Sequence, residues 1–162
     1  MSMDRYSLRE VAPDAYAAMV ALDRTVHESS LPRYLLELVK MRASQRNRCA
    51  YCLAMHSKDA VALGIPPEKL FLLEAWREAP FYTERERAAL AWTEALTLIA
   101  DRGVSDDVYQ EARAHFSERE LAALTMAIVV SNGWNRIAIS TRMESGQYQS
   151  RLTPSPQAEP VP

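Results

Sequence analysis

The chain has 162 residues, of which 25% are charged and 48% hydrophobic, and its formal net charge is -2. These values are ordinary for one globular domain, which at this length buries roughly two thirds of its unfolded surface. The nearly balanced charge provides no basic surface, so we expect no nucleic-acid partner. The N-terminus lacks the apolar region of a secretory signal, and no apolar run approaches the roughly 20 residues of a membrane span. We therefore expect a cytoplasmic protein without a membrane partner.

The N-terminal part is predicted to contain an arm followed by a helix. The first ten residues form the expected arm, and from Pro13 apolar residues recur with the helical period until Ser29 and Ser30. Proline suits the start of a helix because its missing N–H would be unpaired there. His27 falls in the last turn, where a cationic side chain is favourable. We interpret it as a helix-terminal residue rather than a member of a site.

A second predicted helix opens at Pro32 and carries a wide apolar face of leucine, valine and methionine. Glu37 interrupts this face. From its spacing alone, Glu37 would form a surface ion pair with Arg33 or Lys40, since side chains three or four residues apart on a helix are neighbours. The pattern by itself thus favours a structural role for Glu37.

The most informative stretch, Cys-Ala-Tyr-Cys-Leu-Ala-Met-His, runs from Cys49 to His56 and holds both cysteines of the chain. A third helix is predicted from Cys49 to Leu63, ended by Gly64 in the left-handed conformation. Because a helix advances by about 100° per residue, Cys49, Cys52 and His56 share one face. Two thiols and an imidazole are therefore expected to converge.

This spacing suits redox chemistry. A thiol near a helix N-terminus and facing a base has its pKa lowered from the free value of about 8.5, which favours the nucleophilic thiolate. A second thiol three residues away can condense with a sulfenic acid formed on the first. In a reducing compartment, a CxxC pair serves catalysis or metal binding rather than structural cross-linking.

Helix start signals mark the remainder of the chain. Pro66-Pro67 begins a fourth helix, and Ser105 caps a later one. Two capping boxes, in which a hydroxyl residue is followed three positions later by glutamate, begin at Thr83 and Ser117. The helix from Thr83 is predicted to run to Gly103.

The helix from Ser117 contains the longest apolar run, Leu121 to Val130, and Asn132-Gly133 is a candidate kink or interruption within it. No stretch alternates with a clear period of two. We therefore predict an all-α fold, a compact domain of about seven to eight helices in residues 1–152. Residues 153–162 are expected to form a disordered, Pro-rich tail.

Two segments, Leu36–Gln45 (LELVKMRASQ) and Cys49–Ala60 (CAYCLAMHSKDA), together with Trp134-Asn135-Arg136, resemble the AhpD-like branch of the carboxymuconolactone decarboxylase family. The specific element is glutamate, eleven intervening residues and CxxCxxxH. The resemblance implies an AhpD-like helical fold and alkylhydroperoxidase activity without a cofactor or metal. It also implies a homo-oligomer, either a trimer or a hexamer.

By this resemblance, Glu37, Cys49, Cys52 and His56 match the four functional residues of the branch. Cys52 is the expected peroxidatic cysteine, which attacks a small-molecule hydroperoxide, and Cys49 resolves its sulfenic acid as a disulfide. His56 and Glu37 form the implied proton relay that removes the thiol proton, with a water between them. A dithiol reductant protein, which the sequence does not identify, then reduces the disulfide. Tyr51 occupies a position where some members carry histidine, and a phenol with a pKa near 10 cannot replace imidazole as a base at neutral pH.

Three alternatives remain open. Lactone decarboxylation would not need two thiols, and no cluster of arginines accompanies the motif. A zinc-binding or redox-sensing module could use Cys49, Cys52 and His56, with His27, His115 or Glu37 as the fourth zinc ligand. Finally, the two cysteines could be buried apolar residues without a function.

Overall fold

The computed structural model describes residues 5–152, and every regular element within this range is a helix. In chain order these are α1 (Leu8–Val11), α2 (Pro13–His27), α3 (Arg33–Asn47), α4 (Ala50–Ala62), α5 (Pro67–Phe71), the short 3-10 helix η1 (Leu72–Ala75), α6 (Glu84–Thr97), α7 (Ile99–Arg102), α8 (Asp106–His115) and α9 (Glu118–Thr141). The predicted all-α class is confirmed. The α-helices of the described range number nine because α1 and α7 add two short helices of four residues each. The predicted tail at 153–162 lies outside the described residues.

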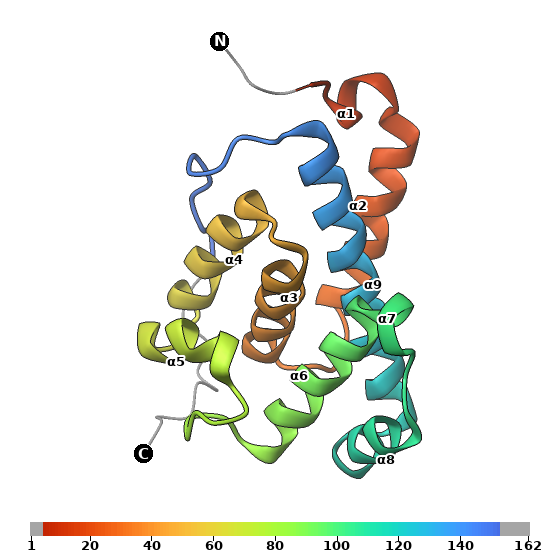
Figure 1. The fold of residues 1–162 in the computed structure, drawn as a ribbon. Coiled ribbons are helices and arrows are strands. Elements are labelled where there is room, and N and C mark those ends of the chain that lie inside the picture. Colours follow the sequence, from red (N-terminus) through yellow and green to blue (C-terminus); the bar gives the residue numbers. More distant parts are fainter. Residues whose placement is uncertain (1–4, 153–162) are drawn as a thin grey trace.

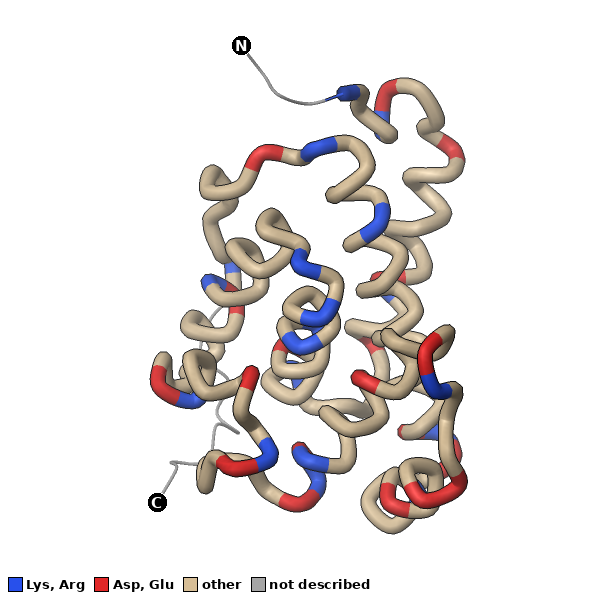
Figure 2. The backbone as a smooth tube through the Cα atoms, viewed as in Figure 1, with Lys and Arg blue, Asp and Glu red and all other residues tan. Residues whose placement is uncertain are grey.

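Helix α3 lies at the centre of the bundle, with α4, α6 and α9 packed around it (Figure 1). Every residue from 35 to 44 is buried, so this helix has no solvent-facing side over most of its length. Its charged residues must therefore find partners inside the protein. Arg42, for example, lies 2.7 Å from Glu74 and 2.6 Å from Glu94. In Figure 2 the basic residues of α3 accordingly lie in the middle of the molecule rather than at its edge.

The N-terminal arm is partly corrected by the structure. Residues 8–11 form α1, whose end is closed by the Ala12 N–H donating to the Leu8 carbonyl. The backbone N–H of Arg5 donates to the Thr141 carbonyl at 2.8 Å, and its guanidinium contacts the Ser140 carbonyl at 3.3 Å. These contacts fasten the start of the described chain to the end of α9.

The predicted single helix from Thr83 to Gly103 is also corrected. Its capping box is present, but the helix divides at Leu98, whose backbone angles of φ -103° and ψ 30° are not helical. Gly103 then ends α7 with a φ of 64°. The chain can thus change direction toward Ser105, which caps α8 as predicted.

Helix α9 begins with the predicted capping box at Ser117 and runs without interruption through Asn132-Gly133. The candidate interruption is therefore not found, and Gly133 lies against α2. A Cβ atom at Gly133 would lie only 2.9 Å from the terminal methyl group of Met19 on α2. The Asn132 side chain donates a hydrogen bond of 2.9 Å to the Ile128 carbonyl of the same helix. The dipeptide therefore lies within a helix, close to Met19, rather than in a turn.

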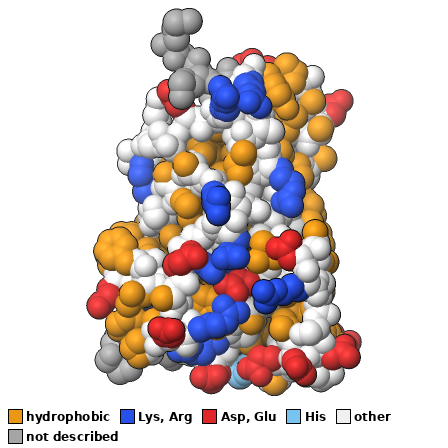
Figure 3. All heavy atoms as spheres, viewed as in Figure 1, with side chains coloured by type: hydrophobic (Ala, Val, Ile, Leu, Met, Phe, Trp, Pro, Cys, Tyr) orange, Lys and Arg blue, Asp and Glu red, His pale blue; other side chains and the backbone are white. Residues whose placement is uncertain are grey.

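On the face drawn in Figure 3, basic and acidic side chains are interspersed, with apolar side chains between them. Among the described residues, no helix combines the length and apolar character needed to cross a membrane.

Candidate active site

The two cysteines lie at the junction of α3 and α4. Helix α4 was predicted to begin at Cys49 but begins at Ala50, so Cys49 is its N-cap. Cys52 occupies the first turn of α4. The two sulfurs form a disulfide, and the Cys52 N–H points at the Cys49 sulfur at 3.4 Å. Both residues are at most 2% exposed, yet Cys52 lines a pocket and Cys49 does not. Cys52 is therefore the sulfur that a small molecule in this pocket would meet first.

An asparagine cluster holds the turn that leads into the disulfide. The Asn47 amide donates to Asn132 at 2.9 Å and to Asn135 at 2.8 Å, and Asn135 donates to the Ser44 hydroxyl at 3.0 Å. These bonds tie the end of α3 to α9. Arg48, which follows Asn47, adopts the left-handed conformation with a φ of 57°. The resemblance at Trp134-Asn135-Arg136 thus has a structural reason, since Asn135 helps to fix the backbone immediately before Cys49.

Glu37 and His56 meet across the α3–α4 interface. The Glu37 carboxylate lies 2.8 Å from His56 Nδ1, and both residues are buried. Because His56 is one turn beyond Cys52 on α4 and lines the same pocket, the pair lies beside the accessible sulfur. All four residues predicted from the sequence are therefore brought together at one junction.

The surface ion pair expected for Glu37 is wrong in its location. Glu37 does pair with Lys40, at 3.1 Å, but the two residues are only 3% and 4% exposed because α3 is buried on all sides. Burial alone would raise the pKa of Glu37. The hydrogen bond with His56 and the charge of Lys40 outweigh it and lower that pKa to about 2. The carboxylate is thus ionised at any physiological pH.

Two groups beyond Lys40 were not predicted as site residues. His27 Nε2 lies 3.0 Å from the Lys40 ammonium and 3.5 Å from the Asp23 carboxylate. His27 does end α2, as expected, but it and Asp23 also line the pocket. Burial raises the pKa of Asp23, and the hydrogen bond with His27 and the charge of Lys40 lower it by more. Because His27 and Asp23 lie far from the CxxC motif in the sequence, no local pattern predicted that they would line the same pocket.

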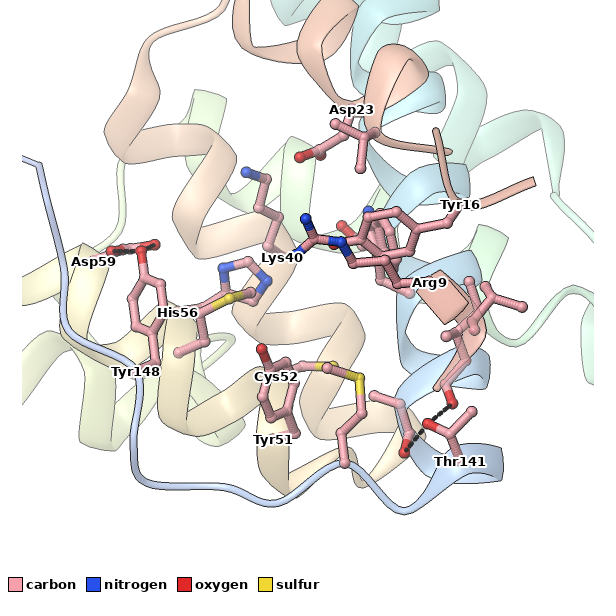
Figure 4. A pocket seen from close by; sticks show the side chains of 18 of the residues that line it. Arg9, Tyr16, Asp23, Lys40, Tyr51, Cys52, His56, Asp59, Thr141 and Tyr148 are labelled. Carbon is pink, nitrogen blue, oxygen red and sulfur yellow. Dashed lines mark hydrogen bonds between the residues drawn. The ribbon is translucent and has the colours of Figure 1, made fainter. Parts of the chain in front are cut away.

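The pocket has a volume of about 540 Å³ and lies between α1, α2, α4, α9 and the segment that follows α9 (Figure 4). Its wall combines Asp23, His27, Lys40 and His56 with tyrosine and tryptophan side chains. Tyr16 and Trp134 meet edge to face, with ring centroids 5.7 Å apart. Tyr51 also lines the pocket, and burial raises the pKa of its phenol, so it is neutral at physiological pH. The volume falls within the range of small-molecule sites.

The chain beyond α9 closes one side of the pocket. Tyr148 donates to the Asp59 carboxylate at 2.8 Å, and the Lys58 ammonium donates to the Tyr148 carbonyl at 2.6 Å. Burial, followed by the hydrogen bond with Asp59, raises the pKa of Tyr148 to about 12. Asp59 lies nearly one turn beyond His56, and the sequence analysis did not select it.

The zinc ligand set considered from the sequence is not assembled in this disulfide form, because the two sulfurs are bonded to each other and offer no thiolate. His115 lies on α8, where it contacts Glu111 at 3.4 Å. A different group, Glu37, His56 and Asp59, brings its ligand atoms within 4.8 Å of one another. The Lys40 ammonium beside Glu37 already neutralises part of that site, which disfavours a further cation.

An all-helical bundle whose CxxC disulfide adjoins a pocket and a buried glutamate-histidine pair defines an AhpD-like protein. Residues 13–95 match the model of the carboxymuconolactone decarboxylase family. The chain therefore belongs to the carboxymuconolactone decarboxylase family, and the predicted AhpD-like branch is confirmed.

Similar proteins agree with this assignment. The uncharacterized protein YdfG of Bacillus subtilis is 38% identical over 136 residues, covering 84% of this chain and 92% of its own length. A structure of a protein of unknown function from Agrobacterium tumefaciens, which bears the name "Putative Antioxidant Defence Protein AhpD", superimposes with a TM-score of 0.86 at 40% identity, over 90% of this chain and 99% of that one. The debrominase Bmp8, solved in complex with 2,3,4-tribromopyrrole, gives a TM-score of 0.76 at 21% identity, over 84% and 73% of the two chains. At that identity it supports the fold alone.

Proposed function

We propose that this protein is a thiol-dependent peroxidase that reduces organic hydroperoxides through a Cys52 sulfenate and a Cys49–Cys52 disulfide. The observation that carries the proposal is the position of the two sulfurs. They are close enough to form a disulfide, only Cys52 lines the pocket, and His56 lies one turn away in contact with Glu37. The likeness to the AhpD-named structure of Agrobacterium supports the same chemistry.

The first step activates Cys52 in the reduced protein. The ionised Glu37 carboxylate accepts a hydrogen bond from His56 Nδ1–H, which leaves Nε2 as the basic nitrogen. Nε2 takes the Cys52 proton, directly or through one water. The thiolate then attacks the terminal peroxide oxygen and the O–O bond breaks. Cys52 becomes a sulfenic acid, and the departing alkoxide takes a proton from the imidazolium and leaves as an alcohol.

Cys49 completes the oxidation. Its thiol attacks the Cys52 sulfur, the S–O bond breaks, and the sulfenic oxygen leaves as water while the disulfide forms. An external dithiol must return two electrons and two protons to the disulfide and becomes a disulfide itself. Because Cys52 lines the pocket and Cys49 does not, we propose that the reductant attacks Cys52 from the pocket side. The reductant, a homo-oligomeric assembly and a cytoplasmic location remain parts of this proposal.

The proposal is tested by adding one equivalent of an organic hydroperoxide to the reduced protein. We expect both thiols to disappear and the mass under denaturing conditions to fall by roughly 2 Da, as disulfide formation requires. Cys49→Ser should stop at an oxidised Cys52, and Cys52→Ser should leave the peroxide intact. Two free thiols and unchanged peroxide in the wild-type protein would overturn the proposal.

Lactone decarboxylation, the activity in the family's name, remains a second candidate to be measured beside the peroxidase. The described pocket contains one arginine, Arg9, rather than an arginine cluster. Lactone turnover that survives loss of both cysteines would favour this candidate.

A further inference from the structure

Arg9 is an exposed charged residue at the pocket, and it has no hydrogen-bond or ion-pair partner among the described residues. The other charged side chains of the pocket are paired: Asp23 with His27, Lys40 with Glu37 and His27, and Asp59 with Tyr148. Within residues 5–152 no hydrogen bond or ion pair involves the Arg9 guanidinium, although it lines the pocket. A guanidinium at the edge of a pocket that contains several aromatic side chains is a ready partner for an anionic group of a ligand.

The position of Arg9 is fixed by the fold. Helix α1 carries it, and Arg5, just before that helix, is bonded to the carbonyls of Ser140 and Thr141 at the end of α9. Figure 4 shows the Arg9 side chain reaching from α1 into the pocket, on the side of Tyr16 and Lys40. The backbone that carries Arg9 is therefore held beside the pocket rather than on a free arm, while its side chain is exposed to solvent.

The remaining wall suits an apolar or aromatic body. Tyr16 and Trp134 form an edge-to-face pair on one side, and Tyr51 lines the pocket next to Cys52 in the sequence. Flat aromatic faces bury large apolar areas of a ligand at a small cost in side-chain entropy. The volume of about 540 Å³ leaves room for a ligand with one ring and a short side chain.

We infer that the pocket binds small carboxylates with an aromatic or short apolar body, and that Arg9 holds the carboxylate. A guanidinium and a carboxylate can form two parallel charge-assisted hydrogen bonds, which gives both affinity and orientation. This inference deepens the proposed function and rests on it for the reactive end of the substrate. The substrate class is then an organic hydroperoxide that also carries a carboxylate, and the alcohol product keeps that carboxylate.

The experiment measures binding to the disulfide form by calorimetry at low salt, so that no turnover is needed. The probes are phenylacetate and phenylacetamide, which have nearly the same size and differ in charge. We expect the wild-type protein to prefer phenylacetate by about tenfold, in line with one charge-assisted contact. Arg9→Gln should remove the preference, and Arg9→Lys should keep part of it. Arg24→Gln is the matched control, because Arg24 lies on α2 in an exposed pair with Glu28 and should leave the preference unchanged.

A second measurement tests whether the ligand binds next to Cys52. In the reduced protein, phenylacetate should slow the alkylation of Cys52 by neutral iodoacetamide, and it should do so less in Arg9→Gln. Equal binding of the two probes to the wild-type protein, or a preference that survives Arg9→Gln, overturns the inference. Since calorimetry involves no peroxide, an intact carboxylate preference without hydroperoxide consumption would overturn the peroxidase alone. Hydroperoxide consumption without that preference would overturn the carboxylate site alone.

Discussion

The Lys40 ammonium lies 3.1 Å from the Glu37 carboxylate inside helix α3, and neither side chain is more than 5% exposed. The pair belongs to a longer line of polar contacts that crosses three helices. In order, the contacts are His56–Glu37 at 2.8 Å, Glu37–Lys40 at 3.1 Å, Lys40–His27 at 3.0 Å and His27–Asp23 at 3.5 Å. Glu37 thus divides its two oxygens between an imidazole and an ammonium, and the Lys40 charge balances its own.

The first prediction concerns the ion pair between Lys40 and Glu37. Lys40→Met removes the ammonium and leaves the buried Glu37 charge with His56 alone. Because breaking a buried pair leaves an uncompensated charge, we expect the free energy of unfolding at neutral pH to fall by about 3 kcal/mol. Urea denaturation followed by circular dichroism measures the loss. Arg24→Gln is the control, since its pair with Glu28 is exposed and should be worth less than about 1 kcal/mol. Equal effects of the two substitutions would contradict a stabilising role for the buried pair.

A second prediction follows from the lowered pKa of Glu37. The pKa falls from an ordinary 4.5 to about 2 on folding, so the ionised group stabilises the folded state above pH 4.5. That contribution is lost as the pH falls from 4.5 toward 2, and it amounts to about 3 kcal/mol by linkage. The difference in unfolding free energy between the wild-type protein and Glu37→Gln should therefore shrink as the solution is acidified through this window. If this difference in unfolding free energy stayed constant with pH, folding would not lower the pKa of Glu37.

The third prediction concerns the segment after α9. Tyr148→Phe removes the donor to the Asp59 carboxylate and leaves a buried acceptor without that bond, which should cost about 1 to 2 kcal/mol. We expect faster tryptic cleavage at Arg151, because the segment is then held chiefly by the Lys58 contacts. Tyr109→Phe is the control, since Tyr109 is exposed on α8, with its ring 6.3 Å from that of Trp92, far from the segment after α9. Cleavage rates that are the same in both variants would mean that the Tyr148 hydroxyl does not hold the segment.

The fourth prediction tests the asparagine cluster. Asn47→Ala and Asn135→Ala should each destabilise the protein by about 2 kcal/mol, because Asn47→Ala leaves the buried Asn135 oxygen unpaired and Asn135→Ala takes the donor from the buried Ser44 hydroxyl. Since the two side chains share a hydrogen bond of 2.8 Å, the double variant should lose about 1 kcal/mol less than the sum of the single losses. A double-mutant cycle by denaturant unfolding measures this coupling. Strict additivity would contradict a shared network behind Cys49.

The sequence alone was sufficient for the class of fold and for the order of most helices. Helix caps are local, and the capping boxes at Thr83 and Ser117 therefore start α6 and α9 as predicted. Where tertiary packing competes with a local signal, the prediction was wrong. Asn132-Gly133 is a common turn signal, but it lies inside an uninterrupted helix that packs against α2 near Met19. The break at Leu98 had no comparable signal in the sequence.

The candidate site was likewise predicted only in part from the sequence. The spacing of Cys49, Cys52 and His56 put three groups on one helix face, because that geometry depends only on the pitch of a helix. The family resemblance added Glu37, whose own spacing suggested a surface pair. Only the tertiary structure decided that α3 is enclosed on all sides, and this enclosure turns the pair into a buried one and brings His27, Asp23 and Arg9 to the same pocket. Contacts between residues far apart in the chain depend on how the helices pack, which no local pattern of residues encodes.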